Sequence, residues 1–224
     1  MIKRILLLAA VTIGFSPAQA SLVVNFADLA DSITTTSDGT GAIDEGGHQP
    51  YVFNFNTGLG LTVQGIETGT GNQSYAYLDE AWSGHGQGGM GVCTALASDG
   101  KHCNPSSDDN VSDGELLRLI FDQSVRIESL TFNNNHDGGF NSTTIDIDSL
   151  VTSVVDGIGS RVISTGWNVS ANYMFDIAYI AGVNRDNHFY LESMVVSQVP
   201  EPSILLLLGS GLLGLGFFSR KRVI

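Results

Sequence analysis

The densest group of ligand-type side chains in this chain lies in an acidic segment, Asp108 to Glu115. Its oxygen donors are Asp108, Asp109, Asn110, Asp113 and Glu115. Carboxylates this close repel one another, and a hard cation such as Ca²⁺, which takes about six to eight oxygens, relieves that repulsion. The spacing is not that of an EF-hand, because Gly114 comes one position late. We predict a calcium site here. A solvated acidic turn that bonds its own backbone is the alternative.

Three further side chains in expected loops could complete such a calcium site: His136, Asp137 and Asp186. A second combination, Asp79-Glu80 beside Trp82, sets carboxylates next to a flat apolar ring. That pairing suits contact with a glycan, and Trp82 capping a core is the alternative. A carboxylate pair for glycoside cleavage can be hidden among the acids, because the distance that matters is spatial.

Sequence motifs for enzymatic catalysis are absent from the chain. It has no Gly-x-Ser-x-Gly elbow, no His-Glu-x-x-His and no phosphate-binding Gly-Lys-Ser/Thr loop. We therefore name no catalytic residue and expect a non-enzymatic protein. The alternative is a secreted polysaccharide hydrolase or lyase that uses acids near Trp82 or in the acidic segment.

The N-terminus has the pattern of a secretory signal peptide. Lys3 and Arg4 precede an apolar run, Ile5 to Phe15, and Ala18-Gln19-Ala20 gives the small-x-small cleavage pattern. We assign residues 1–20 to a signal peptide that the Sec translocon and signal peptidase handle. The only two cysteines, Cys93 and Cys103, then meet an oxidising compartment, which predicts a disulfide between them. Two reduced thiols are the alternative.

The C-terminal 26 residues form a segment with three distinct parts. Val199-Pro200-Glu201-Pro202 is followed by 16 apolar residues, Ser203 to Phe218, and then by Arg220-Lys221-Arg222. The apolar run predicts a transmembrane helix whose basic end stays in the cytoplasm. As a helix it spans about 24 Å, less than a hydrocarbon core of about 30 Å. The prolines keep the preceding peptide extended and accessible to a protease. A plain C-terminal anchor is the alternative.

These three parts in this order resemble the PEP-CTERM sorting signal, which exosortase-type transpeptidases read in Gram-negative bacteria that make exopolysaccharide. The resemblance implies that the tail, residues 199–224, is cut near Pro200-Glu201-Pro202. The upstream domain would then be released or attached at the surface, after a transient stay in the inner membrane.

The net charge of the upstream domain limits the classes of molecule that it can bind. Five of the ten Lys and Arg residues but only one of the 23 acids lie in the two end segments. Residues 21–198 therefore carry five cations and 22 acids, a formal net charge of −17. Such a surface repels nucleic acid and anionic lipid headgroups. Divalent cations and neutral polymers fit it better.

Residues 21–198 are predicted to form one all-β domain. Apolar residues alternate with polar ones around Phe53, Leu61, Tyr77, Ile145 and Phe175. Glu115 to Phe121 is assigned to a further strand because Gly114 and a polar turn flank it. We predict an antiparallel β-sandwich of jelly-roll type with few helices.

Two irregularities are expected in this domain. In Val125 to Phe132 the apolar residues change parity, so we predict a bulge or bend near Glu128-Ser129. Gly84 to Gly91 and the following Cys93–Cys103 segment are expected to form a long irregular excursion.

The domain also resembles, more loosely, the uncharacterised domains that precede PEP-CTERM tails, in Gly89-Met90-Gly91-Val92-Cys93, Ser107-Asp108-Asp109-Asn110 and Phe189-Tyr190-Leu191. The function expected from all these features is that of an exported surface or matrix protein that binds or scaffolds exopolysaccharide.

Overall fold

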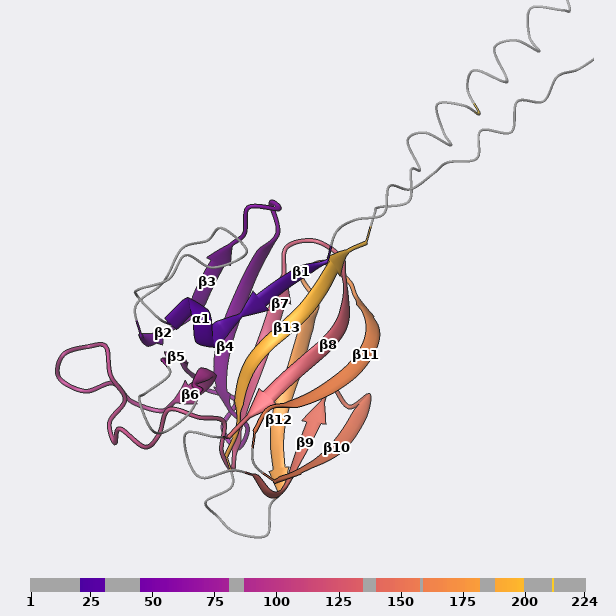
Figure 1. Cartoon of the computed structure of the whole chain (residues 1–224). Helices are drawn as coiled ribbons and strands as arrows, with labels where there is room; N and C mark the ends of the chain where they lie inside the picture. Colours follow the sequence, from indigo (N-terminus) through magenta and orange to yellow (C-terminus); the bar gives the residue numbers. More distant parts are fainter. Residues whose placement is uncertain are drawn as a thin grey trace, which may run out of the picture.

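The computed structural model describes residues 21–30, 45–80, 87–134, 140–157, 159–181, 188–199 and 211. Within these ranges the chain forms thirteen strands and one short helix (Figure 1). The elements are β1 (Leu22–Asn25), α1 (Phe26–Ala30), β2 (Gly46–His48), β3 (Tyr51–Asn54), β4 (Gly60–Glu67), β5 (Gln73–Asp79), β6 (Gly89–Cys93), β7 (Glu115–Phe121), β8 (Val125–Asn133), β9 (Phe140–Ile147), β10 (Val151–Gly157), β11 (Arg161–Val169), β12 (Met174–Ala181) and β13 (Tyr190–Gln198).

The strands form one continuous sheet with the order β10-β9-β12-β7-β4-β5-β6-β13-β8-β11. Three further strands pair beside this path: β1 with β13, β2 with β5, and β3 with β4. Every pairing between these strands is antiparallel. The sheet curls so that β13, β8 and β11 lie across from β7 and β12 (Figure 1). The predicted all-β antiparallel class is confirmed. The strand order does not establish the jelly-roll connections, which stay a prediction.

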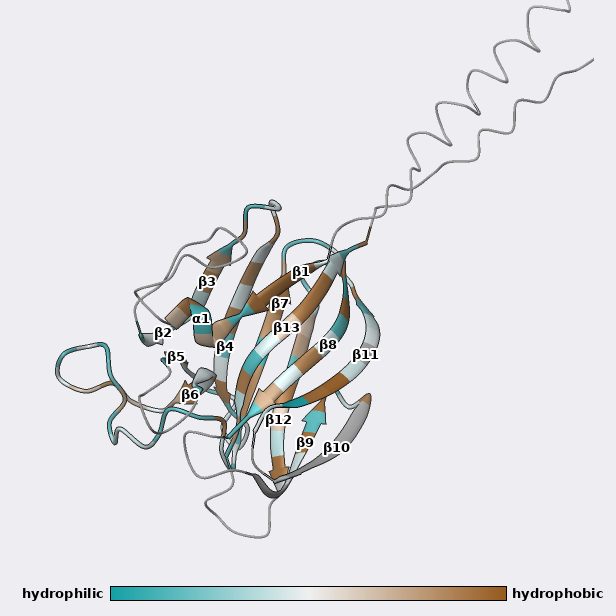
Figure 2. Cartoon of the chain, in the orientation of Figure 1, coloured by the Kyte–Doolittle hydropathy of each residue, from teal (hydrophilic) through white to brown (hydrophobic). Residues whose placement is uncertain are grey.

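The curl encloses one main hydrophobic core, because alternate residues of each strand point inward. In β7, for example, residues 115, 117, 119 and 121 are buried and the intervening residues are partly exposed. Apolar and polar bands alternate along β8 and β13 (Figure 2). In β3, the ring centroids of Phe53 and Tyr51 lie 4.9 Å apart, and the Phe26 ring of α1 meets the Phe53 ring edge-on at a centroid distance of 5.7 Å.

The bulge predicted near Glu128-Ser129 is confirmed. Val125, Ile127, Leu130 and Phe132 are all fully buried, although a regular strand would place the two pairs on opposite faces. The pairing of β8 with β13 shifts register between Val195, opposite Ser129, and Val196, opposite Ile127. One extra residue on β8 thus returns its apolar side chains to the core.

The two ends of the described domain lie together. Leu22 of β1 pairs with Val196 of β13, and the backbone amide of Val199 donates to the carbonyl oxygen of Ser124 at 2.9 Å. Chain positions 22 and 199 therefore emerge at one end of the sheet (Figure 1). No helix among the described residues is both long and apolar enough to span a membrane. The segments assigned to the signal peptide and to the transmembrane helix lie outside the described residues, apart from residue 211.

Candidate functional site

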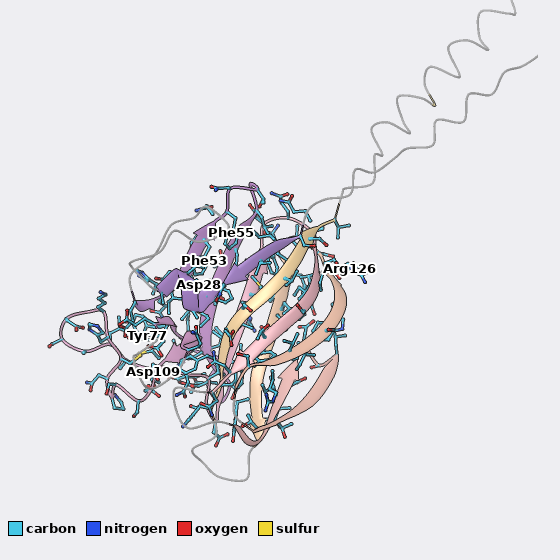
Figure 3. All side chains as sticks on the ribbon, in the orientation of Figure 1. Asp28, Phe53, Phe55, Tyr77, Asp109 and Arg126 are labelled. Atoms are coloured by element: carbon cyan, nitrogen blue, oxygen red, sulfur yellow. A yellow bond between two sulfur atoms is a disulfide. The ribbon has the colours of Figure 1, made fainter. Side chains whose placement is uncertain are left out.

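A pocket of about 360 Å³ lies at the end of β5, beside the disulfide. Four carboxylates line it: Glu45, Asp79, Glu80 and Asp109. Tyr77 and His102 also face it. Figure 3 shows Tyr77 and Asp109 on the same side of the molecule, near the bonded sulfur atoms. We call this the acidic pocket.

Strand pairing brings Glu45 and Tyr77 together in the acidic pocket. Gly47 of β2 pairs with Tyr77 of β5, and Glu45 lies directly before the first residue of β2. The Tyr77 hydroxyl donates a hydrogen bond to the Glu45 carboxylate. Burial, and then this neighbouring carboxylate, raise the pKa of Tyr77 well above its usual value. Tyr77 therefore stays a neutral donor at physiological pH.

A different segment supplies Asp109, and it crosses β6 at very close range. The backbone carbonyl oxygen of Asp109 would lie 1.9 Å from a Cβ atom at Gly91, so only glycine permits this crossing. The Tyr190 hydroxyl of β13 donates to Asp109 Oδ1 at 2.9 Å. Val111 and Phe189 then exchange backbone hydrogen bonds of 2.8 and 3.1 Å. The loop is therefore held against the sheet at Asp109 and again at Val111.

The predicted disulfide is confirmed. Cys93 at the end of β6 is bonded to Cys103, with Cα atoms 5.8 Å apart. Both residues pack with Tyr77 in a small apolar cluster separate from the main core. The bond therefore fixes the loop that carries His102 to β6, which pairs with the strand that carries Tyr77.

His102 is bound within its own turn. Its Nδ1 lies 2.5 Å from Asp99 Oδ2. The hydrogen bond from His102, followed by those from the backbone amides of residues 101 and 102, lowers the pKa of Asp99 to about 2. The same bond raises the pKa of His102, because it favours the imidazolium form. This turn places an imidazole with a raised pKa in the lining of the acidic pocket.

Three of the residues predicted to bind calcium accept hydrogen bonds from different parts of the protein. Asp108 accepts from the amide and hydroxyl of Thr94, and Asp109 accepts from Tyr190. Glu115 accepts from the amide and hydroxyl of Ser112 at 2.9 and 2.8 Å. Asn110 is buried and Asp113 is exposed. Within the described ranges no group of three or more His, Cys, Asp and Glu side chains is arranged to hold a metal. Calcium binding stays a prediction.

The structure joins two regions that the sequence suggested separately. Asp79 and Glu80 were singled out beside Trp82, and Asp109 within the acidic segment, and all three line the acidic pocket. Trp82, His136, Asp137 and Asp186 lie outside the described residues. Sequence reasoning missed Glu45, Tyr77 and His102. The Tyr75–Tyr77 alternation located the strand, but only the β2–β5 register shows that Glu45 joins it.

The fold ends where the C-terminal tripartite pattern begins. Residues 198–222 match the PEP-CTERM protein-sorting motif. This chain carries a PEP-CTERM sorting domain. The motif implies an exported, membrane-anchored precursor and an exosortase as its processing partner. No curated protein and no solved structure matches the chain.

Proposed function

We propose that this PEP-CTERM protein acts at the cell surface or in the extracellular matrix, where it binds or scaffolds exopolysaccharide without catalysing a reaction. The observation that carries the proposal is the junction between fold and tail. The motif match starts at residue 198, and among the described residues the last backbone hydrogen bond is made by Val199. Cutting the tail at Pro200-Glu201-Pro202 would therefore leave every described strand in place.

The charge of the domain supports the kind of partner. With a formal net charge of −17 over residues 21–198, it is repelled by nucleic acid and by anionic lipid headgroups. A hydrated polysaccharide imposes no such repulsion when it is neutral. After its release from the inner membrane, the domain would remain soluble at the surface and be held there by glycan contacts.

Cell fractionation of a motif variant tests the sorting route. The triple substitution Pro200→Ala, Glu201→Ala, Pro202→Ala should leave full-length chain in the membrane fraction. Wild type and the control Ser203→Ala should yield a shorter chain in the surface and extracellular fractions. Identical size and distribution for the triple variant and wild type would contradict the proposal.

Cosedimentation of the purified 21–198 domain with the cell's own exopolysaccharide tests the binding role. We expect the domain to sediment with the polymer and to release no new reducing ends from it. A domain that stays entirely in the supernatant would contradict binding.

The acidic pocket favours a second candidate, a polysaccharide hydrolase or lyase. Carboxylates from distant segments, Asp79 and Asp109, meet there, and paired carboxylates perform glycoside cleavage. This candidate predicts reducing-end release that Asp79→Asn or Asp109→Asn abolishes. The control Asp113→Asn changes an exposed acid outside the pocket lining and should keep that activity. Absence of release from the exopolysaccharide would reject the candidate.

A further inference from the structure

A second pocket, of about 240 Å³, lies between the β9–β10 turn and the end of β11. Asp148 and Leu150 of the turn form one side. Trp167 of β11 and Tyr173, just before β12, form the other. β10 and β11 are the two terminal strands of the sheet path, and the pocket is lined by the turn that precedes β10 and by the end of β11. We call it the aromatic pocket.

Two apolar side chains at this pocket are unusually open to solvent. Tyr173 is 48% exposed and Leu150 is 57% exposed. Trp167 is partly buried, and its ring packs against the fully buried Phe175 ring at a centroid distance of 5.8 Å. Contact with Phe175 therefore holds the indole in place, while the neighbouring Tyr173 and Leu150 side chains are exposed to solvent. Aromatic rings held in this way present a flat apolar face at a small cost in conformational entropy.

The polar side of the aromatic pocket is also held in place. The Tyr173 hydroxyl donates to Asp148 Oδ2 at 3.1 Å, and the Asp176 amide donates to Asp148 Oδ1 at 3.3 Å. Asp148 and Ser149 adopt left-handed backbone conformations, with φ of 52° and 56°, which define the tight turn. Asp176 is in turn bound by Arg118 through two 2.8 Å hydrogen bonds. A carboxylate has about four acceptor positions, so Asp148 keeps acceptor capacity for a ligand hydroxyl.

We propose that the aromatic pocket binds one ring of a neutral hexopyranose polymer, an inference that rests on the proposed exopolysaccharide-binding role. A pyranose has an apolar C–H face, which stacks on an aromatic ring, and a rim of hydroxyls, which donate to a carboxylate. Tyr173 and Trp167 supply the first surface, and Asp148, Asn168 and Ser170 supply partners for the second.

The volume and the charge of the aromatic pocket restrict which ligands it can bind. The volume is below the roughly 300–1,000 Å³ typical of pockets that enclose drug-sized ligands, so a single ring fits better than several. Asp148 within the pocket and the −17 charge of the domain oppose the carboxylate of a uronic acid. The preferred polymer is therefore uncharged.

Tryptophan fluorescence provides a direct test, because the chain has only two tryptophans. In a Trp82→Phe background the signal comes from Trp167 alone. Neutral hexasaccharides of glucose (α- and β-linked), galactose and mannose are the probes, and oligogalacturonate is the charged comparison. We expect a saturable change in fluorescence with at least one neutral probe. Tyr173→Ala should raise the dissociation constant for that probe by about tenfold or more, as for loss of a central aromatic contact.

The matched control is Met174→Ala, which truncates the next residue along the chain, 55% exposed and not part of the pocket lining. It should bind as wild type does, and thermal melting should show that both variants are folded. The inference is overturned if no neutral probe changes Trp167 fluorescence, if folded Tyr173→Ala binds as wild type does, or if oligogalacturonate binds as tightly as the best neutral probe.

Failure of the proposed exopolysaccharide-binding function would give a different set of results from failure of the pocket assignment. In that case the exported wild-type protein would be missing from the polysaccharide fraction of the cells, although the purified domain still bound a neutral hexasaccharide. Failure of the pocket assignment would appear as protein present in that fraction without any Trp167 response.

Discussion

At the scale of single residues, burial changes the titration of the Glu115 carboxyl. Its side chain begins β7 and is 5% exposed. Burial raises its pKa from 4.5 to about 7, against the opposing effect of the two Ser112 hydrogen bonds. Between these values the folded state binds more protons than the unfolded state, so the contribution of Glu115 to stability falls as pH rises through this window.

Glu115→Gln should remove this pH dependence. The amide oxygen can still accept from Ser112, and no buried charge forms above pH 7. We expect the variant to equal wild type near pH 4, below the unfolded pKa of 4.5, and to exceed it at pH 8 by on the order of 1–3 kcal/mol in chemical denaturation. Asp113→Asn, which changes an exposed carboxylate nearby, should keep the wild-type pH dependence. Parallel profiles for Glu115→Gln and wild type would contradict this account.

Calcium binding can also be tested with substitutions of single residues. If the acidic segment holds Ca²⁺, millimolar Ca²⁺ should raise the melting temperature more than Mg²⁺ at equal ionic strength, by mass action on the folded state. Asp109→Ala should lose the effect. Tyr190→Phe removes the hydrogen bond to Asp109 but keeps the carboxylate, so it should retain the effect. A melting curve that EDTA leaves unchanged would exclude the site.

At the scale of elements, period-two patterns predicted strands well because one face of each strand is buried. Glu115 to Phe121 was assigned to a strand despite its helical composition, and the structure places β7 there. The parity change in β8 predicted its bulge. The sequence did not reveal the acidic pocket, because the β2–β5 register brings Glu45 to β5 and the crossing of β6 by a loop brings Asp109 there. It did not reveal the aromatic pocket either, since its members come from the β9–β10 turn, the end of β11, and the segment that leads into β12.

A bulge on β11 controls the position of Trp167. The pairing with β8 shifts between Ser164 and Trp167, and Gly166 has a φ of 76°. Gly166→Ala should cost about 1–2 kcal/mol, the strain of a left-handed alanine. Ser164→Ala, an exposed change two residues earlier, should stay within about 0.5 kcal/mol of wild type. Denaturant unfolding measures both, and an unchanged stability for Gly166→Ala would be inconsistent with the bulge geometry.

The disulfide joins a strand to the loop of the acidic pocket. Its ten-residue separation gives about 3 kcal/mol of stabilisation from the restricted unfolded chain. The Cys93→Ser, Cys103→Ser double variant should lose stability on that scale. Reductant should destabilise wild type but not the variant, when both are measured by urea unfolding. Equal stability of the oxidised wild type and the variant would count against the bond.

At the scale of the whole molecule, the described β domain and the sorting motif occupy separate parts of the chain. The first and last described strands pair at one end of the sheet, next to the sorting motif. The core residues of β13 precede that motif, and Val196 is the last of them to be fully buried. A domain built in this way can lose its tail and keep its fold, which is what a processed exosortase substrate requires.

Mass spectrometry of the C-terminus tests this account most directly. The protein would be recovered from cells that have a working exosortase, and its C-terminal peptide would be identified. We predict a chain that ends at or near Pro200-Glu201-Pro202 and lacks the apolar segment. A mature protein that still ends at Ile224 would contradict the account.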